Sequence, residues 1–263
     1  MRWLLKSCAQ GIFAVVPGEG GQRLNRLFQG NIVRKHIPAH LDNFDRLKPF
    51  LRPGMRTGME IGTGWVPTLP LALTAQGIEV HTFDLTRHVT EKAIHAAHDA
   101  VGGDWSLVKY HAPADAARSE LPEGSVDIHF SISVLEHVPE ATVLGLLREA
   151  YRVLAPGGVL FHRIDCSDHF RYCDPSISSV NFLQFGDRLW RILGQNRISY
   201  HNRLRASDFC ALFTLAGFRI VDAKREIDHD ALSALKQMKL NPRFSGYDPQ
   251  DLATTFVSIH AQK

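Results

Sequence analysis

Two glycines directly follow a short apolar run, in the sequence Glu60-Ile61-Gly62-Thr63-Gly64-Trp65. Glycines at such a place let the backbone turn sharply and approach a ligand closely. The helix that follows such a turn offers free N–H groups to the same ligand. A dinucleotide site requires a third glycine, in the order GxGxxG. Pro67 stands at that third position, which disfavours a nicotinamide dinucleotide.

An acidic residue, Asp84, ends the next apolar run, 20 residues after Gly64. A carboxylate at the end of a second strand can accept hydrogen bonds from both hydroxyls of a ribose. The alternative role for Asp84 is to cap the helix that follows it. The glycine loop and Asp84 together favour a binding site for a ligand that contains a nucleoside.

The elements around these residues follow an alternating pattern from residue 55 onward. Short apolar runs are separated by helical stretches, which is typical of a parallel sheet with crossover helices. We expect strands at residues 59–61, 80–83, 105–110, 126–131, 158–164, 218–224 and 254–260. We expect helices at residues 68–76, 90–101, 141–154 and 207–216, the last of them capped by Ser207.

The N-terminal segment differs from the rest in charge. Residues 1–40 carry six Lys or Arg side chains and the single acid Glu19, so they sum to +5, and the other 223 residues sum to −2 (3 − 5). Apolar residues recur at helical spacing near the start. Further helices are expected at residues 24–32 and 39–50.

We interpret residues 1–54 as a helical cap or lid over a domain of residues 55–263. The apolar face of the first helix should pack on that domain. Contact of Trp3, Leu4 and Lys6 with a membrane surface is the alternative interpretation.

Composition excludes several classes of protein. The chain has 263 residues and a net charge of +3, which is too small to imply nucleic-acid binding by itself. Its four cysteines form no CxxC pair, so neither a disulfide framework nor a structural zinc site is expected. The apolar stretches are shorter than the roughly 18 residues that span a bilayer. We therefore expect a cytoplasmic protein with no integral membrane segment.

Five ordered segments resemble motifs of class I S-adenosylmethionine-dependent methyltransferases. The segments are residues 60–64, Asp84, Asp115-Ala116, residues 125–138 and residues 154–158. The resemblance implies an α/β, Rossmann-like sheet of seven mostly parallel strands flanked by helices, with the last strand antiparallel. It also implies S-adenosyl-L-methionine as the cofactor. Trp65, Pro67 and Pro70 depart from the commonest form of the first motif.

The resemblance also assigns cofactor contacts to particular residues. Glu60 would face the amino-acid end, Asp84 the ribose and Asp115 the adenine. The full set implied is Glu60, Gly62, Thr63, Gly64, Asp84, Leu85, Asp115, Ala116 and Ser131. The cofactor is a sulfonium cation, and a mildly acidic domain suits it.

Candidate catalytic residues stand after the fourth and fifth strands. His137 could take a proton from an attacking hydroxyl or amine, or could pack under the cofactor as a structural residue. Asp165 and His169 are further candidate bases in a polar loop, where Asp168 and Tyr172 are candidate substrate contacts. A metal could bind in this loop, but no separate carboxylate cluster supports it, so we predict no metal.

A long stretch, residues 165–206, interrupts the alternation and is interpreted as a helical insertion on the substrate side. Phe182, Phe185 and Leu189 repeat at helical spacing, which favours a buried helix face over a nucleic-acid surface. Arg203 could hold a carboxylate or phosphate of the substrate.

These features favour an enzyme of small-molecule biosynthesis that transfers a methyl group to an oxygen or nitrogen of a small molecule. One alternative is an enzyme that cyclises or cleaves the cofactor itself without an acceptor. A second is a cofactor-binding regulatory module without catalysis. We expect no nucleic-acid partner, and the sequence leaves a homodimer open.

Overall fold

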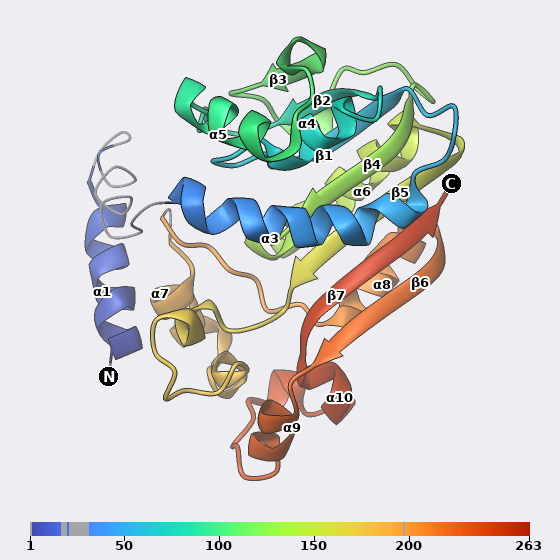
Figure 1. Cartoon of the computed structure of the whole chain (residues 1–263). Helices are drawn as coiled ribbons and strands as arrows, with labels where there is room; N and C mark the ends of the chain where they lie inside the picture. The colour runs from blue at the N-terminus through green and yellow to red at the C-terminus, as the bar shows by residue number, and fades with distance from the viewer. Residues whose placement is uncertain (1, 17–19, 21–31, 197) are drawn as a thin grey trace.

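The seven strands of the protein form one sheet in the order β3-β2-β1-β4-β5-β7-β6 (Figure 1). The computed structural model describes residues 2–16, 20, 32–196 and 198–263. The strands are β1 (Thr57–Ile61), β2 (Glu79–Phe83), β3 (Val108–His111), β4 (Val126–Ile132), β5 (Leu154–Asp165), β6 (Arg219–Ile227) and β7 (Thr254–Gln262). β7 runs antiparallel to both of its neighbours, and the other pairs are parallel. The predicted fold class is confirmed.

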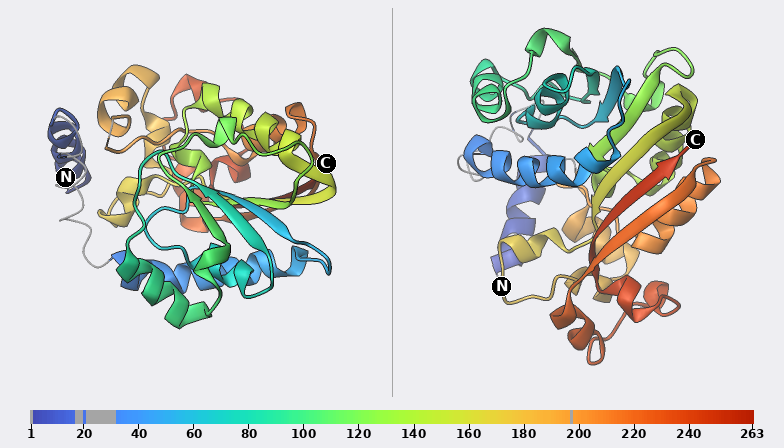
Figure 2. Two further views of the ribbon diagram at one scale, coloured as in Figure 1. Left: turned by 90° about the horizontal axis from the view of Figure 1, so that it is seen from above. Right: turned by 45° about the vertical axis from the view of Figure 1, so that its right-hand side comes forward.

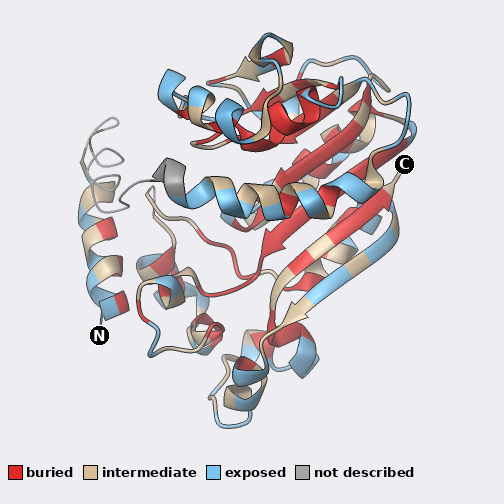
Figure 3. Ribbon diagram, in the orientation of Figure 1, coloured by how far each residue is buried: buried red, intermediate tan, exposed pale blue. Residues whose placement is uncertain are grey.

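Helices cover both faces of the sheet (Figure 2). On one face lie α3 (Ile32–Leu47), α4 (Thr68–Thr74) and α5 (Glu91–Val101), and on the other lie α6 (Glu140–Val153) and α8 (Ala206–Leu215). Leu47 of α3 and Leu69 of α4 share a core with Phe130 of β4. The central strands are buried on both sides (Figure 3), as parallel strands between two helical layers should be.

Two predicted boundaries were wrong for local reasons. The third strand begins at Val108 rather than at residue 105, because Asp104 caps a short 3₁₀ turn, Trp105–Leu107. α8 has Arg205 as its N-cap, and the Arg205 amide donates to the Asp208 carboxylate at 2.8 Å. The expected cap, Ser207, instead bonds the carboxylate of Asp251.

A second hydrophobic core lies beside the sheet and joins three segments that are distant in the sequence. It contains Trp3 of α1 (Arg2–Ala14), Phe182 and Trp190 of the insertion, and Phe244 and Leu252 from residues 228–253. The last segment, which connects β6 to β7, carries α9 (His229–Leu235) and α10 (Pro249–Leu252). These two helices were not predicted.

The insertion consists of short helical elements. It contains the 3₁₀ helices His169–Tyr172 and Asn181–Gln184 and the short helix α7 (Asp187–Gly194). Gly186, with extended backbone angles, separates Phe185 from α7. Phe182 is buried, but Leu189 is 47% exposed, so the predicted apolar face is divided between two elements.

The orientation of α1 also differs from the prediction. The helix buries Trp3, Ser7 and Gln10 against the insertion, and the Ser7 hydroxyl donates to the Leu193 carbonyl at 2.7 Å. Leu5 and Ile12 stay exposed, so the prediction that the apolar stripe packs on the body was wrong. Trp3 is not available to a membrane surface.

Several N-terminal predictions fall outside the described residues. These are Glu19, Arg23, Arg26 and most of the helix expected at residues 24–32. The helix expected at residues 39–50 is present but begins earlier, at Ile32, and continues through Pro38. No helix in the described part of the chain is long and apolar enough to cross a bilayer.

Candidate active site

A cavity of about 320 Å³ opens at the carboxyl ends of β1, β2 and β4. β1 pairs with β2 on one side and β4 on the other, so the chain leaves the sheet in opposite directions at this point. Open α/β sheets bind their ligands at such a switch point. The described residues that line the cavity all lie between Ile61 and Leu146, so the described parts of the cap and the insertion do not contribute to its wall.

The glycine loop forms the floor of the cavity. Gly62 has a φ of +75°, and its amide donates to the Phe83 carbonyl at 2.8 Å. A Cβ at this position would stand 2.6 Å from a methyl carbon of Val134. Gly64 follows with a φ of +67°. Both positions therefore favour glycine over any other residue.

Asp84 directs its carboxylate across the loop. Its two oxygens lie 3.3 and 3.2 Å from the Gly64 amide nitrogen, and the residue lines the cavity. Burial raises the pKa of Asp84 to about 6. The alternative role as a helix cap is excluded, because Thr90 caps α5.

Two further predicted cofactor contacts do not line the cavity. They are Glu60 at the end of β1 and Thr63 within the glycine loop. The Thr63 hydroxyl donates to the Glu60 carboxylate at 2.9 Å. Burial raises the pKa of Glu60 to about 8. This buried carboxyl supports the loop from the end of β1.

The cavity is also lined by Leu85, Asp115 and Ala116. The family resemblance predicts these three residues as cofactor contacts. Asp115 accepts the Ala117 amide at 2.9 Å and thereby caps a short 3₁₀ helix, Ala116–Arg118. Ser131 lies elsewhere. It is buried in β4, with its hydroxyl 2.6 Å from Nδ1 of His162, and it does not line the cavity.

His137 lines the cavity from the turn after β4. Its Nδ1 lies 2.8 Å from the Tyr200 carbonyl oxygen. Desolvation, followed by the neighbouring His169, lowers the pKa of His137 to about 4. The neutral ring therefore donates from Nδ1–H, which leaves Nε2 with a free electron pair.

The loop after β5 brings His169 beside His137, with ring centres 5.0 Å apart. Asp165 holds this loop together. Its carboxylate accepts the Ser167 hydroxyl and the Tyr172 hydroxyl, each at 2.6 Å, and lies 3.1 Å from Nε2 of His169. These contacts make Asp165 a positioning residue rather than a free base.

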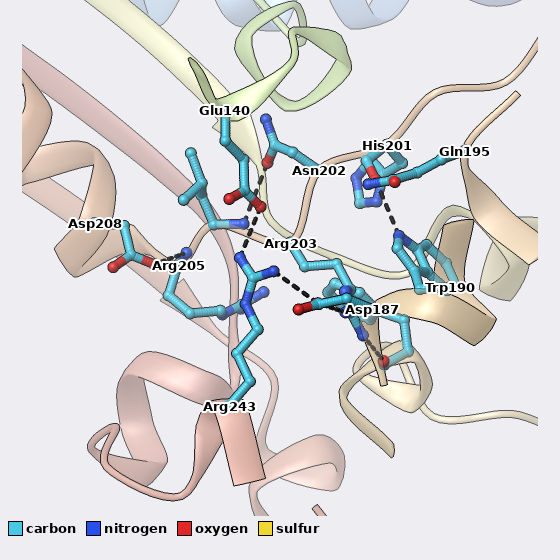
Figure 4. A network of polar contacts seen from close by, with 12 residues as sticks. Glu140, Asp187, Trp190, Gln195, His201, Asn202, Arg203, Arg205, Asp208 and Arg243 are labelled. Atoms are coloured by element: carbon cyan, nitrogen blue, oxygen red, sulfur yellow. Dashed lines mark hydrogen bonds and ion pairs between the residues drawn. The ribbon is translucent and has the colours of Figure 1, made fainter. Parts of the chain in front are cut away.

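Two predicted substrate contacts have internal partners. Asp168 is fully buried, accepts the Phe170 amide at 2.9 Å and does not line the cavity. Arg203 donates to the carbonyls of Phe182 and Phe185 and to the carboxylate of Asp187 (Figure 4). Both side chains maintain the shape of the insertion.

Sequence reasoning missed part of the cavity wall and two buried groups near it. The additional wall residues include Thr86, His88, Val134, Val138, Pro139, Thr142 and Leu146. The two buried groups are Glu136 and His201. Glu136 directly precedes His137 in the sequence, which was an available signal. His201 carries no periodic or motif signal.

Comparison with known proteins agrees with this geometry. Residues 59–162 match the model of a family described as methyltransferase domain. Residues 59–162 are therefore a methyltransferase domain. The match reaches from β1 into β5 and therefore includes every described residue that lines the cavity. The predicted family and its cofactor, S-adenosylmethionine, are confirmed.

Solved structures share the fold of this methyltransferase domain. An S-adenosylmethionine-dependent methyltransferase from Mesorhizobium loti is 21% identical, with a TM-score of 0.50, over 83% of this chain and 96% of that one. A second, from Archaeoglobus fulgidus, is 15% identical, with a TM-score of 0.51, over 86% and 94%. A phosphoethanolamine N-methyltransferase from Haemonchus contortus is 18% identical, with a TM-score of 0.50, over 84% and 52%. No curated protein matches the sequence.

Proposed function

We propose that the protein transfers a methyl group from S-adenosylmethionine to an oxygen or nitrogen of a small molecule in the cytoplasm. The observation that carries this proposal is the cavity at the switch point, where Gly62, Asp84 and Asp115 converge. A volume of about 320 Å³ suits one small molecule of cofactor size. The positive φ of Gly62 and the absence of a Cβ there keep the floor open.

The residues of the cavity fit the three parts of the cofactor. Asp84 would accept hydrogen bonds from the ribose hydroxyls, and Asp115 with Ala116 would contact the adenine. Glu60, held by Thr63, would attract the positively charged amino-acid end through the loop. When bound, S-adenosylmethionine supplies an electrophilic methyl group. Burial raises the pKa values of Glu60 and Asp84, and a bound cation would stabilise the ionised forms of both carboxyls.

His137 is the proposed catalytic residue. It lines the cavity, and its Nε2 is unprotonated at neutral pH because its pKa is lowered to about 4. Such a ring can accept a proton from an attacking hydroxyl or amine as the methyl group is transferred. Most of the rate acceleration would come from aligning the acceptor with the methyl–sulfur bond and excluding water.

Product analysis with radiolabelled S-adenosylmethionine tests the proposal. Methyl transfer yields S-adenosylhomocysteine only when an acceptor is present. Methylthioadenosine formed from the cofactor alone would instead establish a cofactor-cleaving enzyme. Tight cofactor binding without turnover of any acceptor would establish a regulatory module. Phosphorylated amino alcohols are a rational first set of acceptors, because the Haemonchus neighbour is named for such a substrate.

A further inference from the structure

Five ionisable side chains gather at the border between the methyltransferase domain and the insertion. We call Glu136, His137, Asp165, His169 and His201 the border cluster. The ring of His169 lies 4.1 Å from that of His201 and 5.0 Å from that of His137, between ring centres. Ligand atoms of Glu136, His137 and His169 lie within 4.8 Å of one another.

Two members of the border cluster are buried without partners. Glu136 is 1% exposed, and neither of its carboxylate oxygens has a hydrogen-bond partner among the described residues. His201 is 4% exposed, and both of its ring nitrogens also lack one within that part of the chain. A buried carboxylate that is left unpaired costs several kcal/mol.

The other members are held as metal ligands usually are. A ligating histidine commonly donates its second ring N–H to a carbonyl or carboxylate, which fixes the orientation of the ring. His137 makes such a contact to the Tyr200 carbonyl at 2.8 Å, and His169 lies 3.1 Å from the Asp165 carboxylate.

The backbone also holds the two halves of the border cluster together. The Asn202 amide donates to the Glu136 carbonyl at 2.8 Å, and the Asn202 side chain donates to the carbonyls of Leu135 and Val138. The chain that carries His201 is therefore bonded to the turn that carries Glu136 and His137. The positions of these side chains are set before any ligand binds.

We propose that Glu136, His137 and His169 bind a divalent transition-metal ion, with His201 within reach as a further ligand. Two imidazoles and one carboxylate are a donor set of zinc and iron(II) sites. Ligand atoms around zinc stand about 3.4 Å apart, so small side-chain rotations would bring the three groups to bonding distance. The charges of Glu136 and Asp165 balance that of a divalent ion.

The position of the metal gives it a role beside the cofactor. His137 belongs both to the cavity wall and to the border cluster. With the metal bound, Nε2 of His137 would hold the ion instead of accepting a proton, and the ion would coordinate an oxygen of the acceptor and lower the pKa of that oxygen. This role, unlike the binding of the ion, rests on the proposed function. The substrate class it indicates is a small molecule with a hydroxyl group.

Cobalt(II) titration of the full-length, chelator-treated protein tests the site, because the visible absorption of Co²⁺ reports its ligands. We expect one saturable equivalent, displaced by Zn²⁺. His169→Ala and Glu136→Gln should each weaken the binding about 10–100-fold. His95→Ala, an exposed histidine of α5, is the matched control and should leave the titration unchanged.

The proposal is overturned if wild-type protein gives no saturable absorption, or if the His169 variant titrates like wild type. Circular dichroism identifies a variant that fails to fold. His137→Ala removes a ligand with an exposed side chain and serves in place of such a variant. Cofactor binding is measured on the same samples by calorimetry. Metal binding without cofactor binding would refute the proposed function and leave the metal site standing.

Discussion

The carboxylate of Asp84, at the end of β2, lies 3.2 Å from the backbone amide of Gly64, in the turn after β1. This contact links the two strand ends that form the cavity floor. It also directs the acid toward the glycine loop at the edge of the cavity.

Replacing Asp84 with Asn should weaken cofactor affinity about 10–100-fold. The reason is that hydrogen bonds to a charged acceptor contribute about 1.5–3 kcal/mol, and the amide can accept through one oxygen only. Calorimetric titration with S-adenosylhomocysteine measures the effect. Asp99→Asn, on the exposed side of α5, is the control and should bind like wild type. Equal affinity in the two variants would contradict the ribose assignment.

Glu60 should make stability depend on pH. Its folded-state pKa of about 8 lies above the value of 4.5 for an unperturbed glutamate, and burial is the main cause. The stabilising contribution of the protonated form is therefore complete below about pH 4.5 and is lost as the pH rises through about 8. Glu60→Gln should match wild type at low pH and exceed it by at least about 1 kcal/mol above the folded-state pKa.

Denaturant unfolding of both proteins across this pH range checks the prediction. Asp84 titrates in both proteins and enters the difference only through its electrostatic interaction with Glu60. A difference in unfolding free energy that stays constant with pH would show that Glu60 is ionised throughout.

Gly62→Ala should destabilise the protein by about 1–3 kcal/mol and abolish high cofactor affinity. The new Cβ would stand 2.6 Å from a methyl carbon of Val134, at a φ that disfavours side chains. Gly64→Ala has a similar φ but nothing within 4 Å, so about 1 kcal/mol is expected there.

A double variant separates the two causes. Adding Val134→Ala to Gly62→Ala removes the clash and should recover part of the lost stability, while the cost of the backbone angle remains. No recovery would mean that the clash is relieved by movement elsewhere.

Arg203→Met should lower stability by about 2–5 kcal/mol without changing cofactor affinity. The buried guanidinium donates to the carbonyls of Phe182 and Phe185 and to Asp187. Its removal takes a donor from the two carbonyls, whereas Asp187 keeps its ion pair with Arg243. Thermal unfolding and calorimetry give the two quantities. Arg188→Met, exposed on α7, is the control. Reduced acceptor affinity in a fully folded Arg203 variant would restore its predicted role in substrate binding.

The parallel sheet and the edge that holds the cavity were predictable, because each strand there is a short apolar run. Gly62 and Asp84 directly follow such runs and could be placed from their order alone, whereas Asp115 was placed by the family resemblance. Ser131 could not, because its hydroxyl pairs with His162, which lies 31 residues away on the neighbouring strand. Cross-strand partners of that kind leave no local pattern.

The insertion was predicted in position but not in structure. Its helices are short, and its core depends on Trp3, Phe244 and Leu252, which come from both ends of the chain. Arg203 and Asp168 looked like ligand-binding residues because charged side chains are rarely buried. Their partners are backbone groups that only the folded insertion brings together. No metal was predicted from the sequence, because no carboxylate cluster was found in it. Glu136, the carboxylate of the proposed site, directly precedes His137 in the sequence, but the sequence does not show that it is buried.

The matched methyltransferase domain contains only part of the border cluster. Glu136 and His137 lie inside the matched residues 59–162, whereas Asp165, His169 and His201 lie beyond them. The proposed metal site therefore needs residues from both stretches of the chain, whereas the cavity at the switch point needs only the first. Relatives that share the first stretch but carry a different insertion should keep the cavity and lose the metal site.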